Sequence, residues 1–299
     1  MDNITHTLVG VALAEAGLKR RTALASATLM IGANFPDIDV IAVPFGVGLE
    51  WRRGITHGFL ALAILPFVLA WLMQLYDRRV RLRRDPAADP ADYRQLVLLS
   101  AIAMITHPTL DFMNTYGMRW LMPFLNKWFY ADGLFIVDLW LLIVLIAGVV
   151  IARRRKTPSP AYVALVFLAV YTSANLVVTG FGRRAARAQF GDAEVMVAPQ
   201  PLRPWEREVV VDAGDSYRFG AYSLFGGLRM SVATLRKGDD GPAVRLAMEH
   251  REGRKFLRWA RLPFYRVSRT PAGTTVRISD ARYSGEQGGG WASVEVRLP

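Results

Sequence analysis

The sequence predicts an all-α polytopic membrane domain followed by a small antiparallel β domain on the extracytoplasmic side. The first observation is that long apolar runs lie almost entirely before Gly180, in a chain of 299 residues that is 52% hydrophobic. The second is that short segments rich in β-forming residues follow, separated by glycine-containing turns. This change in composition predicts two domains, a helical membrane domain at residues 1–181 and a soluble β-rich domain at residues 182–299.

About six helices are expected in the membrane domain, the first two of them short, because a helix needs roughly 20 apolar residues to cross a hydrocarbon core. The short segments are Thr7–Gly17 and Thr22–Asn34, and the longer ones are His57–Tyr76, Gln95–Met113, Leu134–Ala152 and Ala161–Gly180. Among the longer runs, Gln95–Met113 carries His107 and Asp111 near its C-terminal end. Ionisable groups at that depth are costly, which marks this run as a candidate for function.

Clusters of arginine and lysine indicate the orientation. They lie at residues 19–21, 78–84 and 153–156, and the positive-inside rule places these loops in the cytoplasm. Six crossings then place both termini outside, together with the loops near residues 35–55 and 114–133. No cleaved signal peptide is expected, because the N-terminus lacks a basic start followed by a long apolar stretch.

The soluble domain is predicted from short segments with turn signals between them. The β-rich segments are Val209–Val211, Ser216–Leu224, Leu228–Leu235, Val244–Glu249, Thr274–Ile278 and Ser293–Leu298. Turn-like stretches at residues 238–241, 271–273 and 285–290 separate several of them. This pattern is typical of an antiparallel β domain, which the predicted orientation places outside the cytoplasm. We expect such a domain to offer a surface for a protein partner.

The net charge of +12 does not indicate a nucleic-acid partner. Much of the basic charge stands in short loops beside apolar runs, where it sets membrane orientation. We therefore expect no nucleic acid as the direct partner. The chain has no cysteine, which excludes disulfides and thiolate metal sites.

Histidine and aspartate supply the candidate metal ligands. They are His6, Asp37 and Asp39 in Pro-Asp-Ile-Asp, His57, and His107 with Asp111 in His-Pro-Thr-Leu-Asp. Residues i and i+4 share a helix face, so His107 and Asp111 can point at one ion. Imidazole and carboxylate together suit zinc, manganese or iron, and the carboxylates also allow magnesium or calcium.

The predicted orientation brings all of these residues to one depth, near the outer face of the membrane. This agreement favours a metal or catalytic site over unrelated packed histidines, because the orientation was derived from lysine and arginine alone. An Asp-x-Asp before an apolar run is also typical of a helix cap. Asp2, Asp132 and Asp138 are either further members of the site or caps, and His250 is expected on the surface of the β domain.

Arg52 and Arg53 precede His57 and suit an anionic substrate, because a guanidinium binds two phosphate oxygens at once. The alternative is that they anchor the loop to lipid headgroups. Both arginines depart from the positive-inside rule, as do Arg183 and Arg184, and bound phosphate or a lipid headgroup would explain the departure.

The ordered set of motifs resembles a known family. Asp-Asn-Ile-Thr-His-Thr-Leu-Val-Gly, Pro-Asp-Ile-Asp, Arg-Arg-Gly-Ile-Thr-His-Gly, His-Pro-Thr-Leu-Asp and Asn-Thr-Tyr-Gly, over about residues 1–152, resemble the bacterial LexA-binding, inner-membrane-associated proteins described as metal-dependent hydrolases. That family is more distantly similar to zinc-dependent phospholipase C and zinc-dependent single-strand nucleases. The resemblance implies residence in the bacterial inner membrane. It also implies zinc ligands at His6, Asp37 or Asp39, His57, His107 and Asp111, holding one or two ions because no further histidine follows before His250.

The leading interpretation is a membrane-bound metal-dependent hydrolase of a phosphoester or lipid-linked phosphate at the outer face. Asp37, His57, His107 and Asp111 are the expected core ligands. His6 and Asp39 would hold a second ion or the reacting water, Asp39 would accept a proton, and Arg53 would bind phosphate. The alternative is a non-enzymatic membrane protein with a structural or sensory metal and a partner-binding β domain. A proton-relaying transporter ranks third, because its polar residues would extend through the membrane.

Overall fold

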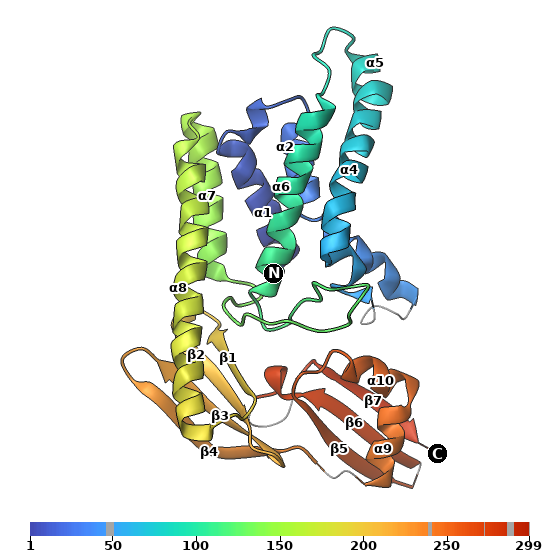
Figure 1. Cartoon of the computed structure of the whole chain (residues 1–299), viewed down its shortest axis with the longest axis vertical. Coiled ribbons are helices and arrows are strands. Elements are labelled where there is room, and N and C mark those ends of the chain that lie inside the picture. Colours follow the sequence, from blue (N-terminus) through green and yellow to red (C-terminus); the bar gives the residue numbers. More distant parts are fainter. Residues whose placement is uncertain (46–50, 239–240, 272, 286–289, 299) are drawn as a thin grey trace. The chain divides into compact units, whose positions relative to one another are not determined.

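The computed structural model describes the whole chain except residues 46–50, 239–240, 272, 286–289 and 299. The described chain divides into two compact units, Met1–Ala174 and Asn175–Pro299. Figure 1 shows helices in the first unit and two sheets in the second. The long helix α8, Ser159–Phe190, contributes residues to both.

The first unit contains the helices predicted from the first five apolar runs and part of the sixth. Its main helices are α1 (Asn3–Glu15), α2 (Ala25–Gly32), α4 (Phe59–Tyr76), α6 (Tyr93–Phe112), α7 (Leu139–Arg155) and the first half of α8. Short helical turns join them: η1 (Leu18–Arg20), η2 (Phe35–Phe45), η3 (Ile55–His57), η4 (Asp77–Arg81) and α5 (Leu82–Arg84). Within the described residues, three helical stretches are long and apolar enough to cross a membrane: Phe59–Arg84, Tyr93–Phe112 and Ser159–Phe190. Six crossings and an outside C-terminus stay predictions.

Aspartates set where several helices begin. Asp2, Asp92 and Asp138 precede α1, α6 and α7, and each carboxylate accepts a hydrogen bond from a backbone N–H of the first turn. Such a cap satisfies donors that the helix itself leaves unpaired. The helix expected from Leu134 therefore begins later: Asp138 caps it, and α7 starts at Leu139.

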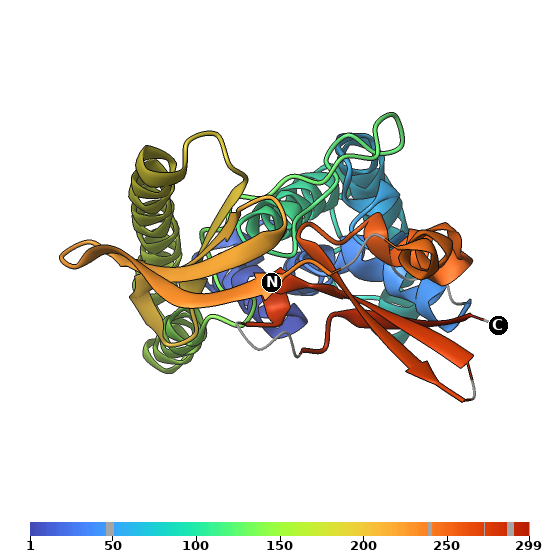
Figure 2. The same ribbon diagram turned by 90° about the horizontal axis from the view of Figure 1, so that it is seen from below.

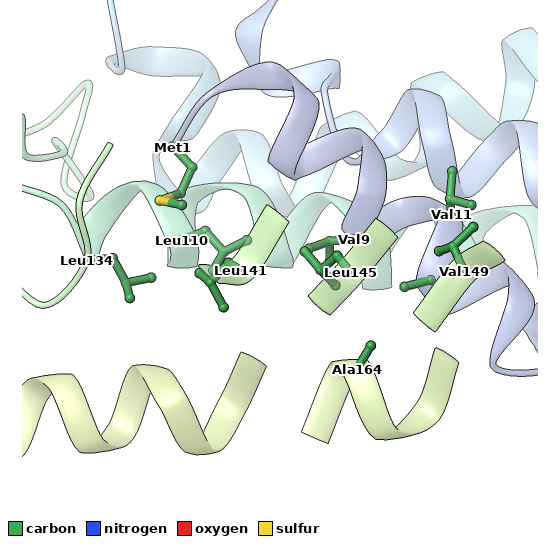
Figure 3. Packing of buried hydrophobic residues seen from close by; sticks show 10 residues of the cluster. Met1, Val9, Val11, Leu110, Leu134, Leu141, Leu145, Val149 and Ala164 are labelled. Carbon is green, nitrogen blue, oxygen red and sulfur yellow. The ribbon is translucent and has the colours of Figure 1, made fainter. Parts of the chain in front are cut away.

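Small residues allow the helices of the first unit to pack closely. Figure 3 shows Val9 of α1, Leu110 of α6 and Leu141 and Leu145 of α7 in one buried cluster with Ala164 of α8. At Gly148, a Cβ atom would lie 2.5 Å from the Cβ of Ala164, so glycine permits the approach of α7 and α8. Close van der Waals packing of this kind holds helices together where lipid surrounds them.

The second unit consists of two antiparallel sheets with helices. One sheet has the order β1-β2-β3-β4, formed by Val195–Gln200, Arg203–Asp212, Ser216–Ser223 and Gly227–Arg236. The other has the order β5-β6-β7, formed by Pro263–Thr270, Gly273–Asp280 and Ser293–Leu298, and α9 (Pro242–Glu249), α10 (Arg251–Leu257) and η5 (Ala281–Tyr283) accompany it (Figure 2). Alternate residues of β2 face opposite ways: Val209 and Val211 pack with Ala186 of α8, whereas Val210 packs with Phe264 of β5.

The prediction of a strand at Val244–Glu249 is wrong, because these residues belong to helix α9. Pro242 occupies the first turn, where a missing N–H costs nothing, and the buried residues Val244 and Ala247 recur at a spacing of three. Strands β1 and β5 and helix α10 were not predicted. Parts of the turns expected at 238–241, 271–273 and 285–290 lie outside the described residues.

A candidate metal centre

Four buried side chains from three segments converge in the first unit. Asp37 comes from η2, His57 from η3, and His107 and Asp111 from α6. One ligand atom from each lies within 4.8 Å of all the others. The i, i+4 spacing on α6 places His107 and Asp111 on one face, as expected. The structure therefore brings together these four of the six predicted ligands, and their ligation of an ion stays a prediction.

The distances within this group match a small coordination sphere. His57 Nε2 lies 3.2 Å from His107 Nε2, 3.5 Å from Asp37 Oδ1 and 3.5 Å from Asp111 Oδ2. His107 Nε2 lies 3.6 Å from Asp37 Oδ1 and 3.5 Å from Asp111 Oδ2. Ligands about 2.0–2.2 Å from a tetrahedral ion are separated by roughly 3.3–3.6 Å. Five of the six separations are therefore close to the spacing that one tetrahedral ion requires.

Hydrogen bonds at the far side of each ring leave Nε2 directed at the group. The Nδ1 of His107 lies 2.6 Å from the carbonyl oxygen of Ala33, so Nδ1 carries the proton and donates it there. The Nδ1 of His57 is 3.0 Å from Thr56 Oγ1 and 3.5 Å from Asp39 Oδ2. A ligating histidine usually donates its other N–H in this way, which fixes the tautomer and the ring orientation.

Asp37 is prepared to act as an anionic ligand. Burial alone would raise the pKa of its carboxyl, but the adjacent His107, His57 and Arg52 outweigh burial and hold the pKa far below the usual range. Asp37 Oδ1 is buried and, among the described residues, accepts no hydrogen bond. Its ion-pair partner Arg52 lies 3.4 Å away, and a cation among the four residues would add a ligand bond to this buried oxygen.

His6 and Asp39 lie beside the group and not among the four. The ring of His6 stacks on that of His107 with centroids 3.8 Å apart, and its Nε2 is 3.3 Å from Asp111 Oδ1. Asp39 Oδ2 accepts a hydrogen bond from the backbone N–H of Arg53 at 2.7 Å, and Oδ1 accepts one from Arg52 at 3.1 Å. Direct ligation of an ion by His6 or Asp39 stays a prediction. Their contacts hold the side chains of the group of four, or residues next to it, in place.

Arg53 is a buried support for Asp111. One terminal nitrogen donates to Asp111 Oδ1 at 2.9 Å, and the other donates to Asn114 Oδ1 at 3.0 Å and to the carbonyl of Gly117 at 3.1 Å. Its guanidinium also lies over the ring of Tyr116, 4.5 Å from the centroid. The amino group of Met1 contacts the same oxygen of Asp111.

Arg52 is the more accessible arginine. Its side chain is 27% exposed, against 5% for Arg53, and one terminal nitrogen lies 3.4 Å from Asp37 Oδ1 and 3.1 Å from Asp39 Oδ1. These carboxylates raise the pKa of Arg52, against the opposing effect of burial. A positive group therefore stands at the partly exposed side of the four ligands.

The remaining candidates have local roles. Asp2 and Asp138 cap α1 and α7, and Asp138 also accepts a hydrogen bond from Tyr171 at 3.0 Å. Asp132 is fully buried but does not belong to the group of four. His250 lies in the second unit, where its side chain accepts a hydrogen bond from Glu252 N at the start of α10.

Two contributions to the site were not predicted. One is Asn114, which fixes Arg53; its motif Asn-Thr-Tyr-Gly was noted without a role. The other is the carbonyl of Ala33, at the C-terminal end of α2. A backbone acceptor carries no signal in the residue type, so only the tertiary structure reveals it.

A surface groove leads to Asp37. It has a volume of about 510 Å³ and lies between α1, α2 and η2, lined by Asn3, Thr7, Met30, Ile31, Asn34, Phe35, Asp37 and Ile38. Ile31 and Ile38 are each 44% exposed. Asn34 Nδ2 donates to Thr7 Oγ1 at 2.9 Å, and Asn34 Oδ1 accepts no hydrogen bond from any described residue. The groove thus joins an apolar surface to a polar end at a candidate ligand.

Comparisons with known proteins agree with a membrane protein. A family model described as YdjM inner membrane protein matches residues 1–183. The uncharacterized protein YfhP of Bacillus subtilis (strain 168) is 24% identical over 180 residues, which cover 57% of this chain and 52% of that protein. The chain thus spans about half the length of this curated relative. No solved structure matches the chain. The descriptions name no reaction, and the β-rich part after residue 183 lies outside the family match.

Proposed function

The chain belongs to the YdjM inner membrane protein family, and we propose that it is a metal-dependent hydrolase acting on a lipid-linked phosphoester. The observation that carries the proposal is the buried group of Asp37, His57, His107 and Asp111, with five of its interatomic distances between 3.2 and 3.6 Å. Two imidazole nitrogens and two carboxylate oxygens suit zinc best among common divalent ions, with manganese or iron as alternatives.

The surrounding residues have distinct tasks in this proposal. Asp37, His57, His107 and Asp111 would hold a divalent ion, which would supply a bound water of lowered pKa and polarise a phosphoryl oxygen. Arg52 contacts the phosphate, because its guanidinium is partly exposed beside Asp37. Arg53 holds Asp111 in place, which refines the predicted role of Arg53 in binding phosphate. Asp39, with Oδ2 3.5 Å from His57 Nδ1, would orient the ring of His57 from its far side, and the proton lost from water would pass to solvent.

The groove beside Asp37 supports a lipid as the substrate. Its exposed isoleucines suit a hydrocarbon chain, while Asn34 and Asp37 mark the end where a polar headgroup would lie. Pockets of roughly 300–1,000 Å³ hold ligands of this size. A lipid entering sideways would bring its phosphate to the site without leaving the bilayer. We therefore place the site at the membrane surface, on the outer side by the positive-inside argument.

The first test is metal content. The full chain, purified in detergent and transferred to lipid nanodiscs, should retain about one zinc, manganese or iron ion per chain, measured by mass spectrometry of the metal. His107→Ala should lose most of it. His250→Asn is the matched control, because asparagine keeps the cap of α10 and lies in the other unit. Equal metal in wild type and His107→Ala would remove the assignment.

The second test is activity. Release of phosphate or headgroup from a panel of phospholipids and polyprenyl phosphates should require the metal and His107. Ile31→Trp, which fills the groove, should slow hydrolysis of lipids but not of a short water-soluble phosphoester. Ile64→Trp, on the exposed side of α4, is its control. Equal lipid hydrolysis by wild type and His107→Ala would end the hydrolase proposal.

One observation favours a second function, a structural or sensory metal. The four side chains are buried and would fill a tetrahedral shell, and structural zinc sites are closed in this way. A catalytic site keeps a position for water. X-ray absorption of the metal-loaded protein separates the two functions: an oxygen ligand beyond the four side chains supports the hydrolase, and its absence supports the structural role.

A further inference from the structure

The sheet β1–β4 has two ends with opposite chemistry. The turns β1–β2 and β3–β4 lie at one end, since Arg203 pairs with Gln200 and Gly227 with Ser223. This end carries exposed large apolar residues, called here the apolar edge: Leu202, Trp205, Leu224 and Phe225, exposed by 59%, 56%, 47% and 103%. The other end carries the turn β2–β3, where Asp212, Ala213, Gly214 and Asp215 follow one another.

Large parts of the apolar-edge side chains are exposed in the described fold. Phe225 is fully exposed at the tip of its turn, and Leu202 has φ 64°, in the left-handed region that disfavours a residue with a Cβ atom. Asparagine or glycine would make the same turn at lower cost. Clustered exposed apolar side chains of this kind usually mark an interaction surface.

Contacts within the second unit show which end of α8 the apolar edge faces. Arg207, four residues after Arg203 on β2, donates to the side-chain and backbone oxygens of Asn175 at 2.7 and 3.1 Å. Arg218, toward the opposite end of the sheet, lies over the ring of Phe190. The apolar edge therefore lies toward the Asn175 end of the helix, and the turn with the two aspartates lies toward Phe190.

The Asn175 end is the membrane end of α8. This helix has no charged residue from Ser159 to Gly182, and Arg183 and Arg184 are the first. Val177 and Phe181, one turn apart on that part of the helix, are 56% and 50% exposed. Figure 1 shows the β3–β4 turn projecting beside the second half of α8. The exposed apolar residues of α8 and the apolar edge of the sheet thus both lie on the N-terminal side of Arg183 and Arg184 along the helix.

We propose that the apolar edge inserts into the lipid interface of the leaflet from which α8 emerges. Trp205 and Phe225 suit this region, where aromatic side chains are favoured, and Arg203 and Arg229 beside the turns suit lipid phosphates. The occupant is the bilayer itself, because the edge adjoins an uncharged membrane helix. The sheet is thereby held against the membrane, and the acidic turn points into water.

Membrane association alone does not test this proposal, since the helices already anchor the chain. Depth does. The chain has no cysteine, so Phe225→Cys and Ala213→Cys each give one attachment site for an environment-sensitive fluorophore in the full chain. Both positions are exposed turn residues, so the fold should tolerate the label. The labelled proteins are reconstituted in vesicles that contain either plain lipids or lipids with a shallow nitroxide quencher.

The label at residue 225 should emit at shorter wavelength and be quenched by the nitroxide lipid more strongly than by aqueous iodide. The label at residue 213 should show the reverse order. Equal iodide quenching at both sites, with no lipid quenching, would overturn the proposal. Protection of residue 225 from both quenchers would overturn it as well, because a protein surface or a second copy would then cover the edge. Neither outcome depends on the metal site.

Discussion

The two units each bury a cluster of opposite charges, and the two clusters differ in where their hydrogen-bond donors lie. In the second unit, Arg282 donates to Asp280 Oδ2 from two nitrogens at 3.0 and 2.8 Å and to the carbonyl of Trp259 at 3.0 Å. In the first unit, two histidine nitrogens and two carboxylate oxygens face one another, and Asp37 Oδ1 accepts no hydrogen bond within the described chain. The cluster of the second unit holds a fold together, whereas the cluster of the first unit could bind a metal ion.

Burial by itself therefore does not indicate a ligand site. The carboxylates of Asp280 and Asp37 are both largely hidden, with side-chain exposures of 0% and 8%. What differs is where the hydrogen-bond donors are. Asp280 accepts close hydrogen bonds from Arg282, whereas Asp37 Oδ1 faces the Nε2 atoms of two histidines, and ligand atoms that face one another in this way can form a site. The predictions that follow test this distinction, from the largest expected effect to the smallest.

Removing Asp280 should have the largest effect on stability. Asp280→Ala leaves the buried guanidinium of Arg282 without its partner, which costs about 3–5 kcal/mol. Hydrogen exchange across residues 259–283 should accelerate while the metal content stays constant. Glu295→Ala, which breaks an exposed pair with Arg277, should cost less than about 1 kcal/mol. A similar loss of stability in both variants would show that the buried ion pair contributes no more than the exposed one.

Removing the metal should destabilise the first unit alone. At a free metal concentration about 100 times the dissociation constant, binding stabilises the folded state by about 2.7 kcal/mol. A chelator should therefore speed hydrogen exchange in peptides containing Asp37, His57 and His107, and leave peptides around Asp280 unchanged. Restoring zinc should reverse the change. Unaltered exchange in all peptides would mean that the four side chains are complete without an ion.

Arg53→Lys should weaken metal binding without abolishing it. An ammonium cannot donate to Asp111 and Asn114 in the fork geometry of a guanidinium, so Asp111 loses part of its support. Partners that orient a ligand are worth about 10–100-fold in metal affinity, and we expect about tenfold here. The measurement is competition with a zinc indicator. Arg52→Lys serves as the control and should leave affinity nearly unchanged, so an equal loss in both would contradict the assigned roles.

Asp138→Ala should have the smallest effect. The carboxylate caps α7 by accepting from Leu141 N at 3.2 Å, and loss of such a cap costs about 1 kcal/mol. Exchange at the first turn of α7 should rise, with metal content unchanged. Asp138→Asn keeps a capping oxygen and should recover most of the loss. If metal content fell in Asp138→Ala, this aspartate would belong to the site.

The sequence determined the helices and much of the site, because both depend on local patterns. Four long apolar runs and two shorter ones predicted the six main helices, and the spacing of His107 and Asp111 placed both on one helical face. Strand predictions were weaker. Val244–Glu249 contains residues that suit either structure, and Pro242 together with the packing of Val244 and Ala247 decided for a helix.

Only the tertiary structure decided which residues act together. Asp37 and Asp39 are equivalent in the motif Pro-Asp-Ile-Asp, yet successive residues of a 3₁₀ helix are about 120° apart, so the two carboxylates point in different directions. Asp37 Oδ1 lies near Nε2 of both His57 and His107, whereas Asp39 contacts the far nitrogen of His57, the backbone N–H of Arg53 and the guanidinium of Arg52. The arginine pair divided in the same way: Arg53 is buried under Asp111, while Arg52 stays accessible. Residue types set what each side chain can bind, and three-dimensional packing set which partner was within reach.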